Sequence, residues 1–333
     1  MLRILLVKTS SLGDVIHNLP VVCDIHAHLP GSIVDWVCET PYADLLALHP
    51  GVRRAVPISL RHLKKNFFSA NAWREFLESK RGIGRERYDF IIDSQGLLKS
   101  AGIAACAHGM RGGYAWDSAR EPLASCFYQR RVSVAKNQHA VVRNRKLVAQ
   151  VLGFPISDEF EYGLRVSNIS SPWLQAGRYA VFLHATSRTD KMWPDADWVV
   201  LGRRLGAQGL RIVLPWGPEE EKNASARLAV SIPEALVAPR LILTEAAHLL
   251  SGAALVVGVD TGLAHLAVAL GAPTIGIFGA TRTELTGLLG GTHEGKNAGT
   301  HAESHAVNLG GAGKAPDVEI VWQTAQKLVG GHA

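Results

Sequence analysis

The segment from Val256 to Pro273 constrains the fold of this chain more than any other. It opens with the apolar run Val256–Val259, turns at Asp260-Thr261-Gly262, and continues as an apolar, helix-like stretch that ends at Gly271. A buried strand that turns directly into a helix leaves backbone N–H groups of the first helical turn without intrahelical partners. The positive end of the helix dipole lies at the same place, so the turn is a candidate anion site, with phosphate as the usual ligand.

The side chains around this turn agree with two interpretations. Thr261 and His265 are four residues apart, so both can lie on one face of the helix beside a bound anion. The alternative is an ordinary strand-to-helix turn in which Asp260 or Thr261 caps the helix. The motif by itself leaves both interpretations open.

Strands and helices alternate along most of the chain. The expected strands are 2–7, 33–38, 55–57, 88–93, 179–184, 211–215, 256–259 and 274–278, and the expected helices include 40–47, 72–80, 139–152 and 198–208. This alternation predicts an α/β fold with doubly wound parallel sheets. Residues 109–113 are expected to break a small-residue helix that runs to about Ala107, and residues 280–316 give no expected element.

The chain is expected to form two domains. Between Gly153 and Pro172 the pattern loosens into short polar pieces, which we interpret as the link. Residues 1–160 and 173–316 then form two Rossmann-like domains, and the last helix, about 317–330, can pack back on the first. Two such domains are expected to face a central cleft with the loops at the carboxyl ends of their strands.

The composition is that of a globular protein. The chain has 333 residues, 47% of them hydrophobic, and its apolar runs are shorter than the roughly 20 residues of a membrane span. The opening run Leu2–Val7 is too short for a secretory signal and is interpreted as the first strand. A reduced, cytoplasmic protein is expected because the four cysteines are scattered without metal-ligand spacing, and three of them lie in apolar segments where a free thiol packs as a small hydrophobe. They are Cys23, Cys38, Cys106 and Cys126.

The formal charge of +6 is unevenly distributed. Residues 1–150 hold 21 Lys and Arg against 12 Asp and Glu (+9), whereas residues 151–333 hold 14 against 17 (−3). The N-terminal half is therefore expected to attract an anionic partner.

Asp14 follows the first strand in a loop of small and polar residues. In a parallel sheet such a loop lies at the carboxyl edge, where α/β folds bind ligands. A carboxylate beside the flexible Gly13 is suited to accept a proton from a hydroxyl group. The alternative interpretation of Asp14 is a helix cap.

The second half carries residues suited to a nucleotide diphosphate. Lys191 lies on a loop of the same domain as the Asp260 turn and can add a positive charge beside it. Glu221 can accept two hydrogen bonds from a ribose diol, although the triplet Glu219–Glu221 also suits a first helical turn. Because the chain lacks a G-x-G-x-x-G fingerprint and a P-loop, a nucleotide sugar is the expected ligand. The D-x-D at 195–197 is interpreted as capping, not as a metal site.

Six motifs in unbroken order resemble glycosyltransferase family 9, the heptosyltransferases, whose fold is GT-B. They are Lys8–Val15, Asp93–Ser100, Ala119–Ser125, His184–Arg188 with Asp190-Lys191 and Trp193-Pro194, Leu214–Gly217, and Val259–His265. The match covers about residues 2–280, and six motifs in series are far more specific than any one.

The resemblance implies transfer of L-glycero-D-manno-heptose from ADP-heptose to the first Kdo residue of Kdo2-lipid A, with inversion at the anomeric carbon. It makes Asp14 the general base and places Lys191 at the donor phosphate and sugar. The donor-binding residues that it implies are Thr186, Ser187, Glu221, Leu241, Asp260, Thr261, Gly262 and His265. The candidates for acceptor binding are Arg61, Lys64, Lys65, Arg120 and Arg143. Neither a metal nor a cofactor is expected.

The expected protein is a cytoplasmic monomer in peripheral contact with the inner membrane, without a nucleic-acid partner. Two other functions stay open at this stage. One is a sister heptosyltransferase that adds the second heptose or another sugar, and the other is a non-catalytic nucleotide-sugar-binding protein. A nicotinamide-dependent or epimerase-type enzyme is disfavoured, because this chain lacks the glycine fingerprint that such enzymes need.

The sequence departs from the family pattern at two places. The loop before Glu219–Glu221 is one residue shorter than expected, which leaves open which glutamate reaches the ribose. After Thr281 the chain continues Arg282-Thr283-Glu284 into a Gly-rich stretch, so the function of residues 281–316 is in doubt.

Overall fold

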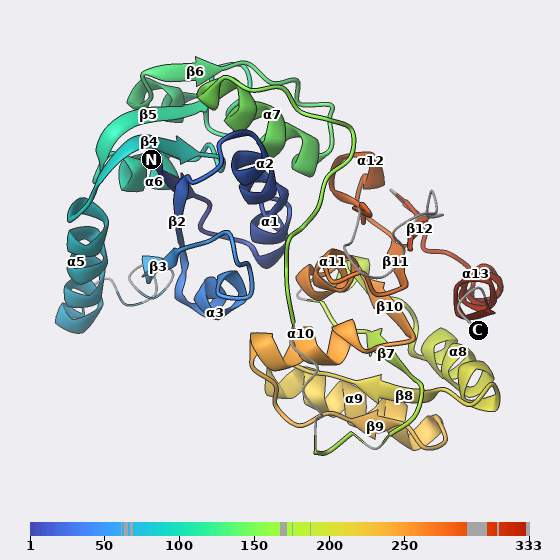
Figure 1. Cartoon of the computed structure of the whole chain (residues 1–333). Helices are drawn as coiled ribbons and strands as arrows, with labels where there is room; N and C mark the ends of the chain where they lie inside the picture. Colours follow the sequence, from blue (N-terminus) through green and yellow to red (C-terminus); the bar gives the residue numbers. More distant parts are fainter. Residues whose placement is uncertain are drawn as a thin grey trace. The chain divides into compact units, whose positions relative to one another are not determined.

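The computed structural model describes residues 1–60, 62, 66, 69–166, 172–174, 176–186, 188–291, 305–311 and 313–330. The predicted site residues Arg61, Lys64, Lys65 and Ser187 lie outside the described residues. The chain divides into two compact units, Met1–Arg165 and Val166–Ala333, drawn in Figure 1 from blue to green and from yellow to red. The division falls inside the segment 153–172 that the sequence suggests as a link.

The first unit is built on a six-stranded parallel sheet in the order β3-β2-β1-β4-β5-β6. The strands are β1 Arg3–Val7, β2 Ile33–Glu39, β3 Arg54–Ile58, β4 Arg87–Asp93, β5 His108–Tyr114 and β6 Arg130–Val132. The helices are α1 Leu12–Ile16, α2 Pro20–His28, α3 Ala43–Leu46, α5 Ala70–Gly84, α6 Leu98–Ala104 and α7 Ala140–Leu152, with the 3-10 turns η1 Thr40–Tyr42 and η2 Pro122–Phe127.

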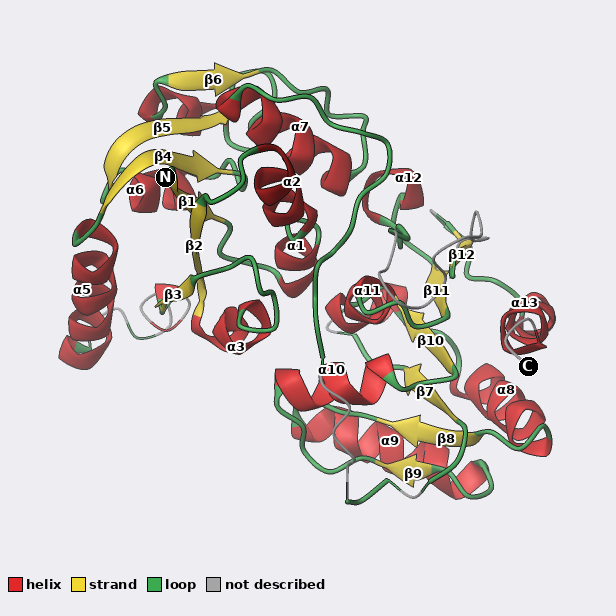
Figure 2. Ribbon diagram, viewed as in Figure 1, coloured by secondary structure: helices red, strands yellow, loops and turns green. Residues whose placement is uncertain are grey.

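The second unit repeats this topology in the order β12-β11-β10-β7-β8-β9. Its strands are β7 Tyr179–Leu183, β8 Arg211–Leu214, β9 Leu236–Val237, β10 Leu255–Val259, β11 Thr274–Phe278 and β12 Ala306–Gly310. Its helices are α8 Asp195–Ala207, α9 Glu219–Ser231, α10 Leu243–Ser251, α11 Gly262–Ala269, α12 Thr283–Thr286 and α13 Val318–Gly330, with the 3-10 turn η3 Thr189–Lys191. Figure 2 shows helices flanking the sheet of each unit. The prediction of two Rossmann-like, doubly wound domains is confirmed.

In each sheet the order in which the chain adds strands reverses at one place, between β1 and β4 in the first unit and between β7 and β10 in the second, while all strands stay parallel. In open α/β sheets ligands bind at this switch point, outside the carboxyl ends of the strands. The loops after these four strands are therefore where a site is expected. The predicted residues Asp14, Lys191 and Asp260 lie in the segments that directly follow β1, β7 and β10.

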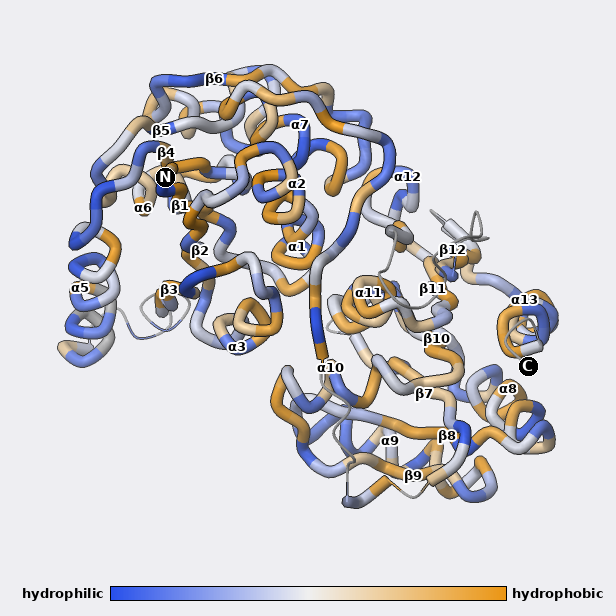
Figure 3. The backbone as a smooth tube through the Cα atoms, in the orientation of Figure 1, coloured by the Kyte–Doolittle hydropathy of each residue, from blue (hydrophilic) through white to orange (hydrophobic). Residues whose placement is uncertain are grey.

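Apolar strands and helix faces form the core of each unit. In Figure 3 the apolar residues concentrate on elements such as β10 and α11, whose residues are buried along most of their length. In the second unit Trp198 of α8 packs against Phe182 of β7 with ring centroids 4.9 Å apart and edge-on against Trp193 with centroids 5.0 Å apart. Such contacts of buried aromatic rings fix helix α8 against the sheet.

Helix α13 belongs to the second unit. Its residues Val321, Ala325 and Val329 are part of that unit's apolar core, and the helix packs on α8. This differs from the expectation that the last helix packs on the first unit. The spacing of four residues places the three side chains on one helix face, which the second sheet and α8 cover.

Strand β5 corrects the expectation that residues 109–113 only break a helix. Gly112 and Gly113 read as breakers in the sequence, but here they lie in a central strand. A Cβ on Gly112 would come within 2.7 Å of Val151, and one on Gly113 within 2.4 Å of Tyr128. The glycines are therefore present because neighbouring side chains approach the sheet too closely for any larger residue.

Among the described residues, no helix is both long enough and apolar enough to cross a membrane.

Candidate functional site

Asp260 is the centre of a polar cluster at the switch point of the second unit. Its Oδ2 lies 2.6 Å from Lys191 Nζ and accepts a hydrogen bond from Thr281 Oγ1 at 2.5 Å. His265 Nε2 lies 3.9 Å from the other oxygen, Oδ1. The loops after β7, β10 and β11 thus meet at one carboxylate.

The surroundings of Asp260 hold it ionised. Burial by itself raises the pKa of Asp260, but the contacts with His265, Lys191 and Thr281 outweigh it and hold the pKa well below its usual range. The side chains of Lys191 and Asp260 are only 17% and 12% exposed. The pair therefore holds the Lys191 side chain beside the first turn of α11.

Thr261, not Asp260, caps helix α11. Thr261 Oγ1 accepts a hydrogen bond from the Ala264 N–H at 3.4 Å, and Asp260 is engaged with Lys191 instead. The backbone N–H groups of Gly262 and its neighbours begin the helix next to this ion pair. The N–H groups of a first helical turn and a fixed ammonium give the positive environment that a phosphate group needs. The helix ends as predicted near Gly271, whose φ of 77° is left-handed.

Glu221 differs from the other two glutamates in its triplet. Its Oε2 accepts a hydrogen bond from the Gly217 N–H at 2.8 Å, which turns the carboxylate back toward the loop after β8. Glu219 pairs with Lys222 on the helix surface instead, at 2.9 Å. Of the three, Glu221 is thus directed toward the carboxyl edge of the sheet. The predicted residues Thr186 and Leu241, after β7 and β9, are half-buried.

Asp14 lies at the switch point of the first unit, in the first turn of α1. Its Oδ2 accepts a hydrogen bond from the Ser11 N–H at 3.0 Å, so the capping role left open by the sequence is present. The same oxygen lies 3.6 Å from Arg120 Nη1. Asp14 is 27% exposed and Arg120 is 56% exposed, so a substrate can reach both groups. Capping uses part of one oxygen and leaves the carboxylate free to accept another hydrogen bond.

Two basic residues accompany Asp14 at this edge. Arg143, on α7, donates from Nη2 to the Ser118 carbonyl at 2.8 Å and lies 5.0 Å over the Tyr114 ring. Lys8, at the end of β1, is buried and donates to the Ser94 carbonyl at 2.7 Å. Burial lowers the pKa of Lys8, against the opposing charge of Asp14. The edge therefore carries positive charge around one accessible carboxylate.

Two residues of these clusters were missed by the sequence analysis, which singled out neither Lys8 nor Thr281 as a site residue. Lys8 directly follows a buried strand, a position at which a charged residue is itself a signal. Thr281 also follows a strand, β11, at the edge where the other site loops lie.

The described residues contain no group of three or more His, Cys, Asp or Glu side chains that could hold a metal ion. Asp195 and Asp197 lie in the first turn of α8, but the N-cap residue is Pro194 and no side chain caps the helix, so the interpretation of these aspartates as capping residues is wrong.

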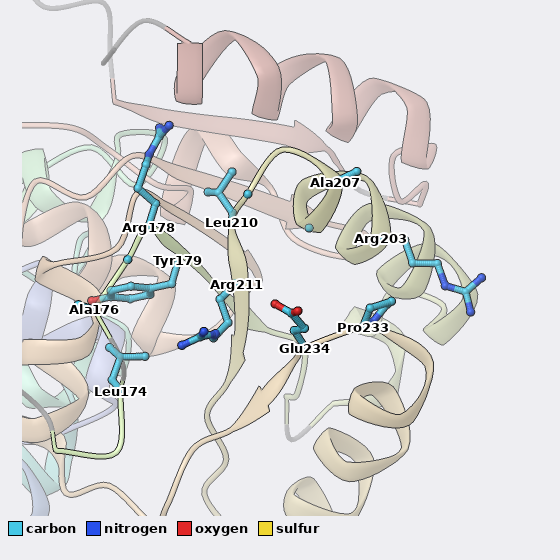
Figure 4. Close-up of a pocket in the computed structure, with 13 residues that line it drawn as sticks. Leu174, Ala176, Arg178, Tyr179, Arg203, Ala207, Leu210, Arg211, Pro233 and Glu234 are labelled. Carbon is cyan, nitrogen blue, oxygen red and sulfur yellow. The ribbon is translucent and has the colours of Figure 1, made fainter.

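A pocket of about 550 Å³ lies elsewhere in the second unit. Its lining includes Tyr179 and Arg211, the first residues of β7 and β8, so it lies at the amino edge of the sheet. Figure 4 shows the guanidinium groups of Arg178, Arg203 and Arg211 pointing in different directions. Because its charges do not converge and it lies at the opposite edge from Asp260, we do not assign the donor to this pocket.

The chain is similar to known heptosyltransferases over nearly its whole length. The family model "Glycosyltransferase family 9 (heptosyltransferase)" matches residues 76–309. Lipopolysaccharide heptosyltransferase 1 of Escherichia coli strain K12 is 43% identical over 310 residues, 92% of this chain and 96% of that protein.

Two solved structures extend this similarity to the fold. The E. coli heptosyltransferase WaaC with ADP superposes with a TM-score of 0.87 at 37% identity, covering 98% of this chain and all of that one. The same enzyme with ADP-2-deoxy-2-fluoro heptose gives a TM-score of 0.81 at 38% identity, with both chains fully covered. The chain belongs to glycosyltransferase family 9, the heptosyltransferases, and is an enzyme with the GT-B fold.

Proposed function

We propose that this enzyme transfers L-glycero-D-manno-heptose from ADP-heptose to the first Kdo residue of Kdo2-lipid A, with inversion at the anomeric carbon. The observation that carries the proposal is the Lys191–Asp260 ion pair at the start of α11, placed at the switch point of a Rossmann-like sheet. Relatives with the same fold bind ADP and an ADP-heptose analogue. A diphosphate is the ligand that this arrangement suits best.

In the proposed mechanism the second unit holds the donor. The N–H groups at the start of α11 and the Lys191 ammonium stabilise the negative charge that grows on the departing ADP. Asp260 fixes Lys191, and Glu221 accepts hydrogen bonds from the ribose. These groups do not have to reorganise during the reaction because the ion pair already exists in the free protein.

The first unit supplies the base. Asp14 accepts the proton of the attacking acceptor hydroxyl, whose oxygen forms the new bond to the anomeric carbon as the bond to ADP breaks. Direct displacement by an attacking group opposite the leaving group inverts the configuration. Arg120 and Arg143 provide positive charge for an acceptor whose Kdo residues carry carboxylates.

The acceptor is supported by the charge distribution. The excess of +9 in residues 1–150 favours an anionic lipid saccharide and also peripheral contact with an anionic membrane surface at its cytoplasmic side. The similarity to a protein named heptosyltransferase 1 at 43% identity favours addition of the first heptose over the second.

Mass spectrometry of product tests this assignment. Kdo2-lipid A, with and without a first heptose, is incubated with the protein and a panel of ADP- and UDP-sugars. We expect a mass increase of one heptose only with ADP-heptose and only on the acceptor that lacks heptose. Modification of the heptosylated acceptor alone would indicate the sister activity, and ADP binding without product would indicate a non-catalytic binding protein.

The variant Asp14→Asn tests the base. An Asn side chain can still accept the hydrogen bond from the Ser11 N–H, so α1 stays capped while the basic oxygen is lost. We expect ADP affinity to stay nearly unchanged and turnover to fall by at least about 100-fold. Asp44→Asn, at the first turn of α3, is the matched control and should keep full activity. Substantial transfer by Asp14→Asn would show that another group is the base.

A further inference from the structure

We propose that an apolar pocket in the first unit binds an acyl chain of the lipid acceptor. The proposal rests on the proposed function and adds a second contact for the same substrate. The pocket has a volume of about 320 Å³ and lies between α5, α6 and the end of β3. Its inner wall is formed by Ile58, Ile83 and Ile103, which are buried members of the first unit's apolar core.

The chemistry of the lining indicates an aliphatic ligand with a negatively charged head. An apolar cavity of about 150 Å³ already binds benzene, so this pocket has room for several methylene groups. Leu98 is 42% exposed at its edge, and the exposed Lys80 and Lys99 also line it. Lysine stems cover apolar surface while their ammonium groups stay in water, where they can meet anionic groups of the ligand.

The position of the pocket connects it to the proposed acceptor site. Ile58 is the last residue of β3, and Leu98 begins α6, so the pocket reaches the carboxyl edge of the sheet. Lys99 Nζ lies 3.5 Å from Ser10 Oγ, in the loop that leads to Asp14. A molecule whose saccharide reaches Asp14 can therefore place its apolar part between α5 and α6.

Such a pocket solves a physical problem of a lipid acceptor. Lifting the saccharide toward the enzyme draws the adjoining methylene groups out of the bilayer, and exposing them to water is unfavourable. Each methylene that enters the pocket instead is worth about fourfold in affinity. The pocket is therefore expected to lower KM for an acylated acceptor without changing the chemical step.

Gly102 on α6 allows the pocket to be filled without disturbing its surroundings. A Cβ built on Gly102 meets no atom within 4 Å, and the residue lines the pocket. Gly102→Leu should therefore place a side chain in the space that we assign to the acyl chain. Gly82→Leu is the matched control, because a Cβ on Gly82 of α5 also meets nothing within 4 Å and Gly82 is outside the lining. Leu98→Ser is a second variant at an exposed position and should not affect folding.

The experiment compares two acceptors that are both monomeric in water, a fully deacylated Kdo-bearing disaccharide and the same molecule with one N-hexanoyl chain. We expect the wild type to have a KM at least about tenfold lower for the acylated acceptor. Gly102→Leu should abolish this difference and Leu98→Ser should reduce it, with kcat and the KM for ADP-heptose unchanged. Gly82→Leu should behave as the wild type.

Two results would overturn the proposal while leaving the proposed function intact. One is equal KM values of the wild type for both acceptors, with transfer still observed. The other is that Gly102→Leu keeps the acyl preference but no longer sediments with phosphatidylglycerol vesicles, which would assign the pocket to a bulk membrane lipid. Failure of the wild type to transfer heptose to either acceptor would instead refute the proposed function, and the acyl site with it.

Discussion

Lys191 and Asp260 are 69 positions apart in the chain, and their side chains form an ion pair of 2.6 Å. The pair joins the loop after β7 to the loop after β10. These two strands are neighbours at the point where the strand order of the second sheet reverses. An ammonium held by a carboxylate beside a helix N-terminus is preorganised for a phosphate group. This geometry leads to separate expectations for catalysis and for stability.

Removal of the Lys191 charge should mainly affect catalysis. We expect Lys191→Met to lower kcat/KM for ADP-heptose by roughly 100-fold or more, because preorganised charges at a leaving group contribute most in the transition state. Steady-state kinetics with varied ADP-heptose measure this loss. Lys327→Met, at an exposed position on α13, is the control and should leave the kinetics unchanged. A fall in kcat/KM of only a few-fold would contradict the assignment of Lys191 to the donor site.

Without the Asp260 charge, the free energy of unfolding should change less with pH in the acid range. The folded pKa of Asp260 lies below its usual range, so its contribution is present above the unfolded value of about 3.9 and is lost as the pH falls below it. We expect Asp260→Asn to lower the free energy of unfolding at pH 7 by about 2–3 kcal/mol and to differ less from wild type near pH 3.

Urea denaturation at the two pH values measures this difference. Asp190→Asn is the control, because Asp190 forms an exposed ion pair with Arg188 and such pairs contribute little. A constant difference between Asp260→Asn and wild type across the whole pH range would contradict the titration argument.

Two buried histidines should make the protein less stable in mild acid. Burial lowers the pKa of His49 and of His184 to about 4. Between about pH 6.5 and pH 4 the unfolded chain takes up protons at these positions and the folded chain does not, so unfolding becomes easier as the pH falls. Each histidine contributes a slope of up to about 1.4 kcal/mol per pH unit.

The variant His184→Gln isolates one of these contributions. His184 Nε2 lies 2.9 Å from Ser225 Oγ, and a glutamine amide can replace that contact without titrating. We expect the free energy of unfolding of the variant to fall less steeply than that of wild type between pH 6.5 and pH 4. Parallel slopes for the two proteins would show that His184 stays neutral in both states or is protonated when folded.

Arg145 connects the chain that leaves the first unit to its core. It binds Asp24 through two hydrogen bonds of 2.7 and 3.0 Å and also donates to the Ser157 and Glu159 carbonyls, each at 3.0 Å. Its side chain is only 2% exposed. We expect Arg145→Met to lower the free energy of unfolding by about 3–5 kcal/mol, because it leaves Asp24 buried without its partner.

An exposed ion pair provides the contrast. Arg282 and Glu284 lie 2.7 Å apart but are 66% and 58% exposed, so Arg282→Met should change stability by less than about 1 kcal/mol. Urea denaturation at pH 7 measures the loss of unfolding free energy for both variants. Similar losses for the two variants would show that burial does not distinguish these pairs.

Residues at strand ends could be predicted from sequence because the parallel sheet forces them together. The loop after each buried strand must lie at the carboxyl edge, so Lys191 and Asp260 were expected near each other from the alternation alone, and the structure confirms this. Their roles in binding and catalysis stay predictions. The orientation of the Glu221 carboxylate toward the loop after β8 could not be predicted from sequence, since it depends on the Gly217 N–H in that loop.

Other features depend on contacts between distant residues that no local pattern carries. Thr281 lies in a stretch without recognised periodicity, yet the parallel pairing of β10 with β11 brings it to Asp260. Strands β9 and β6 have only two and three residues, which is too short for an alternating pattern. Strand β5 was missed because its sequence, His-Gly-Met-Arg-Gly-Gly-Tyr, has the glycine content of a turn.

Those glycines give a final test of how β5 is accommodated. A Cβ on Gly112 would approach the two Val151 methyl groups to 2.7 and 2.8 Å, so Gly112→Ala should cost about 1–3 kcal/mol of unfolding free energy through overpacking. If the clash with Val151 is the cause, the cost should be smaller in a Val151→Ala background, a coupling that a double-mutant cycle measures. Gly82→Ala, in the open on α5, should instead stabilise by about 0.5–1 kcal/mol. Equal costs of Gly112→Ala in both backgrounds would mean that backbone freedom, and not the approach of helix α7, keeps glycine in this strand.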